Sequence, residues 1–172
     1  MKFTTQLLIY WIAILSLIYF PFSVIILPIL GESVNGWMLT GGFLLFCVLP
    51  PAFITAIFYK KLDYMESDDL NPPRFKGQRE AVFRINPRSS HPFDDVLQRI
   101  DRRWIVSFSD RKNHVLKFRT DSRIMAWGIG GYVKMNDDLT VQIVVYPVSS
   151  SSLLTEKVME STLASLRSLF AD

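Results

Sequence analysis

Two long stretches without charge constrain this chain more than any other feature. No Asp, Glu, Lys or Arg occurs from Phe3 to Gly31 or from Ser33 to Tyr59, and Glu32 is the only charge between them. A helix that crosses a lipid bilayer needs about 20 predominantly apolar residues. The sequence therefore predicts a transmembrane helical hairpin over residues 1–61, with spans at about 7–30 and 37–59.

The residues that flank these stretches predict the topology. The polar turn Gly31–Gly36 carries no Lys or Arg, whereas Lys60 and Lys61 follow the second span and Lys2 precedes the first. Cytoplasmic flanks collect Lys and Arg, so we expect a multi-pass protein with both termini in the cytoplasm. The first run is longer than the core of a signal peptide, and no small-residue cleavage motif follows it. We therefore expect it to persist as a span.

Prolines and glycines inside the spans predict helix distortion and helix contact. Pro21 predicts a kink in the first span, and Pro50 and Pro51 predict a strong kink or a break in the second. Gly41 and Gly42 permit close helix packing. Carbonyls freed by proline must find donors within the protein, so we expect these glycines and Pro50-Pro51 to contact a membrane-protein partner or a second copy. The alternative is a self-contained hairpin in which local distortion satisfies the carbonyls.

The remainder of the chain looks like a linker and one compact domain. Residues 62–79 are polar and contain Pro72-Pro73, which predicts an extended linker. Residues 80–172 then alternate between strand and helix patterns in the order β-α-β-β-β-β-α. An antiparallel sheet with both helices on one face is an α+β fold. The other face of such a sheet can stay solvated.

The predicted elements follow from apolar periodicity and turn residues. The strands are Ala81–Asn86, Trp104–Ser109, His114–Thr120, Ile124–Met135 and Leu139–Tyr146, and the helices begin at a Ser89 or Ser90 cap and at about Leu154. The predicted core faces are Trp104, Val106 and Phe108; Leu139, Val141, Ile143 and Val145; and Met159, Leu163, Leu166 and Phe170, widened by Val158, Thr162 and Leu169. Gly128, Gly130 and Gly131 are expected to bend their strand.

The domain resembles a set of uncharacterised small bacterial inner-membrane proteins with N-terminal spans. The similar stretch is Phe118–Leu166, with Trp127-Gly128 in the long strand and Tyr146-Pro147 before the last helix. The resemblance implies a bacterial inner (plasma) membrane location. The segment Ser149–Thr155 departs from those proteins because it has no Gly or Lys, so no functional residue is carried over.

Candidate catalytic and metal-binding residues are few. Ser89, Ser90, His91 and Asp94 have the residue types of a hydrolase, but a triad needs side chains that converge from separate elements, whereas neighbours at one helix start serve that helix. His114 is expected at the surface beside a turn. Two separated histidines and the single Cys47 do not supply a zinc site. We therefore predict no enzyme activity, no metal and no cofactor.

Basic residues gather in the middle of the chain. Leu70–Lys134 holds 14 Lys and Arg against 6 Asp and Glu. A membrane-tethered domain meets the anionic leaflet before it meets nucleic acid, so membrane lipids are the expected partner and nucleic acid is not. The predicted contact residues are Arg99, Arg102, Arg103, Arg111, Lys112, Arg119 and Arg123. The alternative is an ordinary solvated surface.

These observations favour a non-enzymatic integral membrane protein. The leading hypothesis is an accessory or stabilising subunit that docks to a larger inner-membrane complex. The alternative is a membrane-tethered binding module for anionic lipid headgroups or a small ligand.

Overall fold

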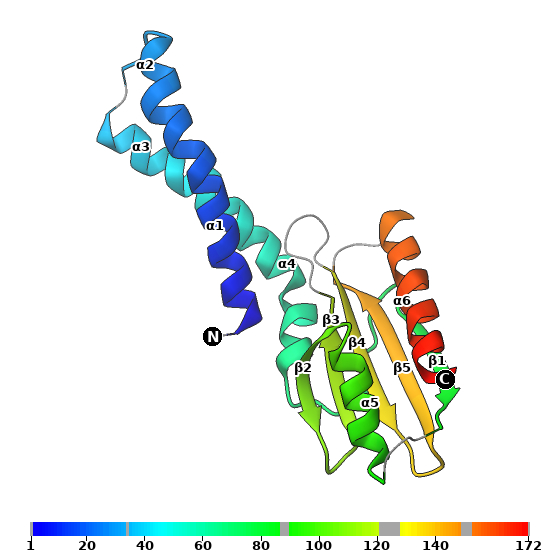
Figure 1. Cartoon of the computed structure of the whole chain (residues 1–172). Helices are drawn as coiled ribbons and strands as arrows, with labels where there is room; N and C mark the ends of the chain where they lie inside the picture. Colours follow the sequence, from blue (N-terminus) through cyan, green and yellow to red (C-terminus); the bar gives the residue numbers. More distant parts are fainter. Residues whose placement is uncertain (1, 34, 87–89, 121–127, 149–152, 172) are drawn as a thin grey trace. The chain divides into compact units, whose positions relative to one another are not determined.

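A computed structural model describes residues 2–33, 35–86, 90–120, 128–148 and 153–171 (Figure 1). The chain divides into two compact units, residues 1–60 and residues 61–172, which are described separately below.

The first unit is a hairpin of two long apolar helices. The first helix comprises α1 (Phe3–Pro21), the π-helical segment η1 (Phe22–Ile26) and α2 (Leu27–Ile29); the second comprises α3 (Gly36–Phe43), η2 (Leu44–Val48) and α4 (Leu49–Glu66). Their 27 and 31 residues are long and apolar enough to cross a membrane. Only 6% and 17% of their most apolar windows are buried, whereas a core helix of a soluble protein would be mostly buried.

The prolines distort these helices without interrupting them. The segment η1 begins directly after Pro21, and η2 ends directly before α4, whose first turn contains Pro50 and Pro51. A π-helical turn absorbs a local change in backbone hydrogen bonding. Of the strong kink or break predicted at Pro50-Pro51, the break is wrong, because α4 continues through both prolines to Glu66.

Gly42 serves packing inside the hairpin. The Tyr19 hydroxyl donates a hydrogen bond to the carbonyl of Leu39 at 3.0 Å, and a Cβ atom at position 42 would overlap that hydroxyl. The rings of Phe20 and Phe43 stack beside it at 5.7 Å. The space where a side chain at position 42 would lie is thus filled by Tyr19 of the hairpin's own first helix. A Cβ atom at Gly41, by contrast, would meet nothing within 4 Å.

The second unit contains a five-stranded antiparallel sheet in the order β1-β5-β4-β3-β2. The strands are β1 (Arg79–Arg84), β2 (Ile105–Asp110), β3 (Val115–Arg119), β4 (Ile129–Met135) and β5 (Thr140–Pro147), and the helices are α5 (Pro92–Asp101) and α6 (Leu153–Ala171). The predicted α+β fold and element order are confirmed. Residues 124–127 of the predicted long strand and the Ser89 cap lie outside the described residues, and His91 takes the N-cap position of α5, where its side chain does not make the capping hydrogen bond.

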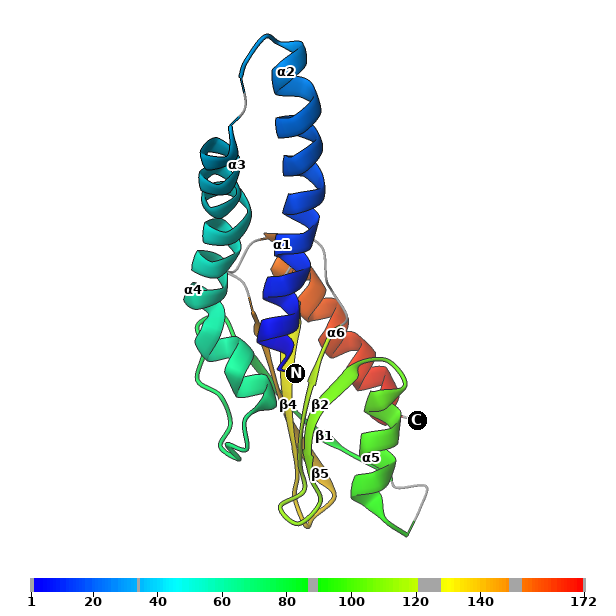
Figure 2. The same ribbon diagram turned by 90° about the vertical axis from the view of Figure 1, so that its left-hand side faces the viewer.

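Both helices cover the same face of the sheet (Figure 2). The main core joins Phe93, Val96 and Ile100 of α5, Met159, Leu166 and Phe170 of α6, and Val141, Ile143 and Val145 of β5. Leu139, Leu163 and Leu169 pack against it while partly buried. Val158, predicted to widen the helix stripe, is 45% exposed and lies outside this core.

A bulge in β2 changes which face its last residues occupy. The pairing of β2 with β3 shifts between Val106 and Phe108. Trp104 and Val106 consequently pack on the main core, while Phe108 packs on the opposite face with Val115. The prediction that Phe108 shares a face with Trp104 and Val106 is wrong, because a bulge inserts one residue into the alternation.

The opposite face of the sheet is covered, not solvated. Leu62 and Met65 in the last turns of α4 are buried, and Tyr64 and Leu70 pack on a second cluster that includes Tyr132. The first residues of the predicted linker 62–79 are thus helix, and the segment packs on the sheet.

Two adjacent glycines in β4 make room for aromatic rings on both faces. A Cβ atom at Gly130 would overlap the ring of Tyr146, and one at Gly131 would overlap the ring of Phe118. The rings of Tyr146 and Phe118 are fully buried, so the glycines serve close packing of the sheet.

Candidate functional site

The most unusual polar group of the domain is the buried Lys117. This residue lies in the middle of β3, between Phe108 of β2 and Tyr132 of β4, on the face opposite α5 and α6. Its relative exposure is 0%. The ammonium donates hydrogen bonds to the carbonyl of Tyr64 at 2.8 Å, the carbonyl of Ser67 at 2.9 Å and the Ser67 hydroxyl at 3.1 Å. A lysine has three donors, so each has an acceptor.

These acceptors explain why a cation lies there. The last carbonyls of a helix have no intrahelical partner, and the C-terminal end of the helix dipole favours positive charge. Lys117 therefore caps the end of α4 from the sheet. Its ammonium also lies 3.9 Å from the centre of the Tyr64 ring and 5.2 Å from that of Phe108, within the range of cation–π attraction.

Three further hydrogen bonds fasten the same segment to the sheet. The Ser107 hydroxyl, placed by the β2 bulge, donates to the carbonyl of Met65 at 2.7 Å. The Tyr132 hydroxyl donates to the carbonyl of Leu70 at 2.8 Å. In the reverse direction, the Lys61 ammonium donates to the carbonyl of Pro147 at 2.6 Å. Strands β2, β3, β4 and β5 all bind residues 61–70, so this segment is a layer of the domain.

An aromatic cluster continues this layer toward β5. The ring of Phe75 lies 5.6 Å from Tyr64 and 4.9 Å from Tyr146, and Tyr64 lies 6.0 Å from Tyr146. The Tyr146 hydroxyl is buried without a hydrogen-bond partner among the described residues. Burial raises the pKa of Tyr146 well above its usual value, and burial also raises the pKa of Tyr132.

Burial lowers the pKa of Lys117 to about 8. The carboxylates of Asp69, Asp68 and Asp63 oppose this shift because they favour the charged ammonium. Asp69 is itself held in its ionised form, since hydrogen bonds from the backbone and side chain of Asn71 lower its pKa.

The stability of the domain is expected to rise with pH between about 8 and 10. Lys117 has a pKa near 8 when folded and about 10.4 when unfolded, so in this range the unfolded chain binds more protons than the folded one. Above about pH 10 the stability is expected to fall with pH, because Tyr132 and Tyr146 keep their protons to higher pH in the folded chain than in the unfolded chain. Chemical unfolding of the full chain in detergent, followed by near-UV circular dichroism from pH 7 to 11, measures both slopes.

The matched control for this pH dependence is Lys117→Met. This variant should show a much smaller rise between pH 8 and 10 and should keep the fall above pH 10. A wild-type free energy of unfolding that is flat or falling between pH 8 and 10 would contradict the assignment.

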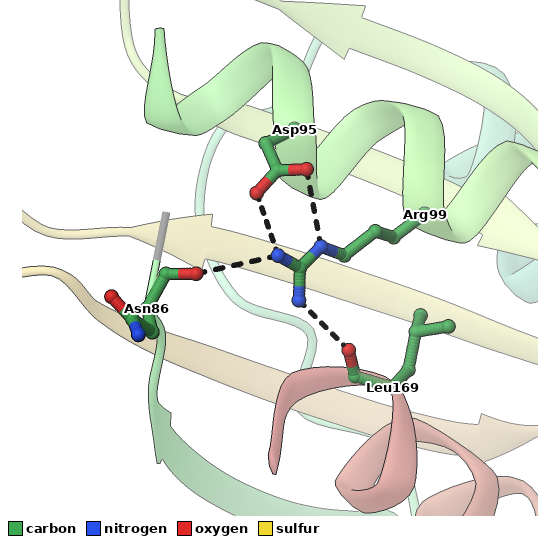
Figure 3. Close-up of polar contacts among 4 residues, drawn as sticks. All are labelled: Asn86, Asp95, Arg99 and Leu169. Carbon is green, nitrogen blue, oxygen red and sulfur yellow. Dashed lines mark hydrogen bonds and ion pairs between the residues drawn. The ribbon is translucent and has the colours of Figure 1, made fainter. Parts of the chain in front are cut away.

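Arg99, predicted to contact an anionic surface, instead makes hydrogen bonds to other residues of the domain (Figure 3). Its guanidinium pairs with both carboxylate oxygens of Asp95, at 3.1 and 2.8 Å. It also donates to the carbonyl of Leu169 in α6 at 3.0 Å and to that of Asn86 after β1 at 3.3 Å. Only 10% of its side chain is exposed. The prediction for Arg99 is therefore wrong, because its donors are used to join α5, α6 and the chain after β1.

The other predicted basic residues do not form one patch. Arg102 and Arg103 precede β2 and Arg111 and Lys112 follow it, so the two exposed pairs lie at opposite ends of that strand. Arg111 also lies 3.1 Å from a carboxylate oxygen of Asp94. Arg119 is half-buried in β3, and Arg123 lies outside the described residues.

The structure brings the two histidines to one cavity of about 430 Å³. The His114 ring lies 5.5 Å from that of Phe93, and His114 has a positive φ of 53°. The cavity lies where α5 begins and the β2–β3 and β4–β5 turns meet. Its lining is His91, Pro92, Phe93, Asp94, Arg111, His114, Met135, Asn136, Asp137 and Leu139. Among the described residues, no group of three or more His, Cys, Asp or Glu is placed to hold a metal ion.

Sequence reasoning missed the role of Lys117, which was counted among the basic residues of the central stretch. The sequence did carry a signal that Lys117 is buried, because its neighbours Val115, Leu116 and Phe118 are apolar on both faces of the strand. Such a run is typical of a strand that is buried on both faces, and a lysine within it must find buried acceptors.

Comparisons with known proteins add no relative. No family model matches the chain, and neither a curated protein nor a solved structure matches it significantly.

Proposed function

We propose that this chain is a non-enzymatic membrane protein that presents its sheet domain at the cytoplasmic face of a bacterial inner membrane and docks to, or stabilises, a larger membrane assembly. One observation carries the proposal. The end of the second apolar helix, residues 61–66, is part of the domain core, where Lys117 caps it. Because the end of the membrane-spanning helix is part of the domain core, the domain is held at the membrane surface. This placement suits docking to another membrane protein.

The chemistry of the buried charges supports a non-enzymatic function. A catalytic acid, base or nucleophile must reach a substrate. Lys117 has its donors on the end of α4 and on Ser67, and Arg99 has its donors on Asp95 and two carbonyls. Both groups therefore stabilise contacts between elements of the fold.

Co-purification in mild detergent, with quantitative mass spectrometry, tests the proposed function. The wild-type chain, expressed at its native level, should retain a membrane protein at fixed stoichiometry. Lys117→Met should lose most of it, because the end of α4 is no longer capped. Lys112→Met is the matched control, since Lys112 is an exposed lysine close to β3 and its loss leaves the cap intact. A wild-type chain without a stoichiometric partner, or a Lys117→Met chain that retains it fully, would contradict the proposal.

The topology is predicted from the basic flanks. Both termini should be cytoplasmic, because Lys60 and Lys61 follow the second span and the Gly31–Gly36 turn has no basic residue. Alkaline phosphatase needs disulfides that form outside the cytoplasm. A phosphatase fused after Asp172 should therefore be inactive, and one inserted in the turn should be active. The opposite pattern would reverse the topology.

The cavity around His91 and His114 favours a second candidate function, the binding of a small ligand. Its volume of about 430 Å³ lies within the range of ligand sites, and Phe93 and Leu139 provide apolar walls beside charged groups. A substitution at the exposed His91 distinguishes the two candidate functions. His91→Ala should leave partner retention unchanged under the leading proposal, whereas a small molecule seen by native mass spectrometry and lost from this variant would favour the second.

A further inference from the structure

Among the described residues, no strand pairs with the outer edge of β1, and the strand itself is regular. The strand lies at one end of the sheet order, and its six pairs with β5, from Arg79 to Arg84, are consecutive. Edge strands are commonly protected by bulges, lysines or prolines. The other edge strand, β2, has a bulge and a bond from Ser107 to the end of α4. The stretch Arg79–Arg84 has neither Pro nor Lys.

The pairing with β5 fixes which backbone groups face the open edge. The amide of Ile85 donates to the carbonyl of Leu139, so the residues in phase with Ile85 (Arg79, Ala81 and Phe83) point their backbone groups toward β5. The alternate residues Glu80, Val82 and Arg84 therefore point theirs outward. Pairing along this edge must use these three residues.

The same three side chains share one face of the sheet. Alternation places them opposite Phe83, which packs on the main core with Phe170. Val82 is 62% exposed, with a carboxylate two residues before it and a guanidinium two residues after it. The Glu80 carboxylate accepts a hydrogen bond from the Gln142 amide of β5 and retains further acceptor sites.

We propose that two copies of this chain pair antiparallel through their β1 edges, about a two-fold axis at Val82, so that their sheets become continuous. Val82 then lies opposite Val82 of the second copy, and each Glu80 lies opposite an Arg84. Opposite charges directly across an antiparallel pair are stabilising, and a two-fold axis creates the charge pair twice.

The charges along β1 favour this register, and they favour a second copy of the chain as the partner. A shift that centres the axis on Glu80 sets like charges opposite each other, since Glu80 faces Glu80 and Arg84 faces Lys76. Axes at Ala81 or Phe83 set Val82 opposite a charged residue. Among the registers centred on Glu80, Ala81, Val82 or Phe83, only the axis at Val82 pairs each carboxylate with a guanidinium, and an axis at Arg84 sets Arg84 opposite itself. Such self-complementarity points to a second copy as the partner, and it does not depend on the proposed function.

Charge reversal on the full chain in nanodiscs tests the pairing. Dimer formation, measured by native mass spectrometry over a dilution series, should weaken about tenfold for Glu80→Arg and for Arg84→Glu, because each variant creates two like-charge pairs. The double variant should recover wild-type dimerisation. A mixture of the two single variants should form heterodimers, since every pair across that interface is opposite in charge. Arg103→Glu is the control, because Arg103 is exposed and remote from β1 in the sheet order.

The outcomes are decisive in both directions. Recovery in the double variant together with heterodimers in the mixture establishes the register without assuming that each single variant is as stable as the wild type. A wild-type chain that stays at the mass of one copy throughout the dilution series would overturn the proposal. So would single variants that dimerise as the wild type does, or a double variant without recovery.

Discussion

Leu166→Asp is expected to unfold the sheet domain. Leu166 is fully buried in the main core between α6 and the sheet. The substitution removes a large apolar side chain, which costs about 2–5 kcal/mol, and it adds the cost of a buried carboxylate without a partner. Domains are stable by only about 5–15 kcal/mol, so little folded protein should remain. Near-UV circular dichroism and limited proteolysis of the full chain in detergent measure the loss.

Two positions on the same helix provide graded controls. Val158 is exposed, so Val158→Asp should change the free energy of unfolding by less than about 0.5 kcal/mol. Leu163 is partly buried, so Leu163→Asp should fall between the two. Cooperative unfolding of Leu166→Asp at the wild-type midpoint would show that α6 does not pack as described.

The second large effect is expected for Arg99→Met. Removing the guanidinium leaves the carboxylate of Asp95, whose side chain is only 12% exposed, without its cation. Breaking a buried ion pair from one side costs about 3–5 kcal/mol. The carbonyls of Leu169 and Asn86 lose a donor at the same time. Urea unfolding of the full chain in detergent should show the loss.

The double variant separates the charge from the packing. Asp95→Leu combined with Arg99→Met removes both charges, and an apolar pair of similar volume often restores the stability of a buried ion pair. We expect the double variant to be more stable than Arg99→Met alone. Arg103→Met, at an exposed arginine, should have almost no effect. An Arg99→Met variant as stable as the wild type would contradict the described network.

The element order and the main core could be predicted because they depend on local patterns. Alternating apolar residues in Val141, Ile143 and Val145, and helical spacing in Met159, Leu166 and Phe170, each record which side of one element is buried. Such patterns need no knowledge of other elements. This part of the fold follows from the sequence alone.

The second face of the sheet could not be predicted because it depends on non-local contacts. The β2 bulge reverses the alternation at Phe108, and a bulge has no reliable local sequence signal there. Ser67 and Leu70 resemble linker residues until their partners, Lys117 on β3 and Tyr132 on β4, are known. Lys117 has the sequence appearance of a surface cation, and only the carbonyls at the end of α4 explain its burial.

The cap on α4 also joins residues that are synthesised at different times. The carbonyls of Tyr64 and Ser67 are separated from the Lys117 ammonium by 53 and 50 residues of chain. A ribosome adds about 5–20 residues per second, so these carbonyls wait several seconds before β3 exists. During that interval both apolar helices have already been synthesised, and the hydrogen bonds from Lys117 to the end of α4 cannot yet form. The sheet therefore completes the end of a helix that was synthesised before it, and under the proposed topology the hairpin can insert before the domain closes.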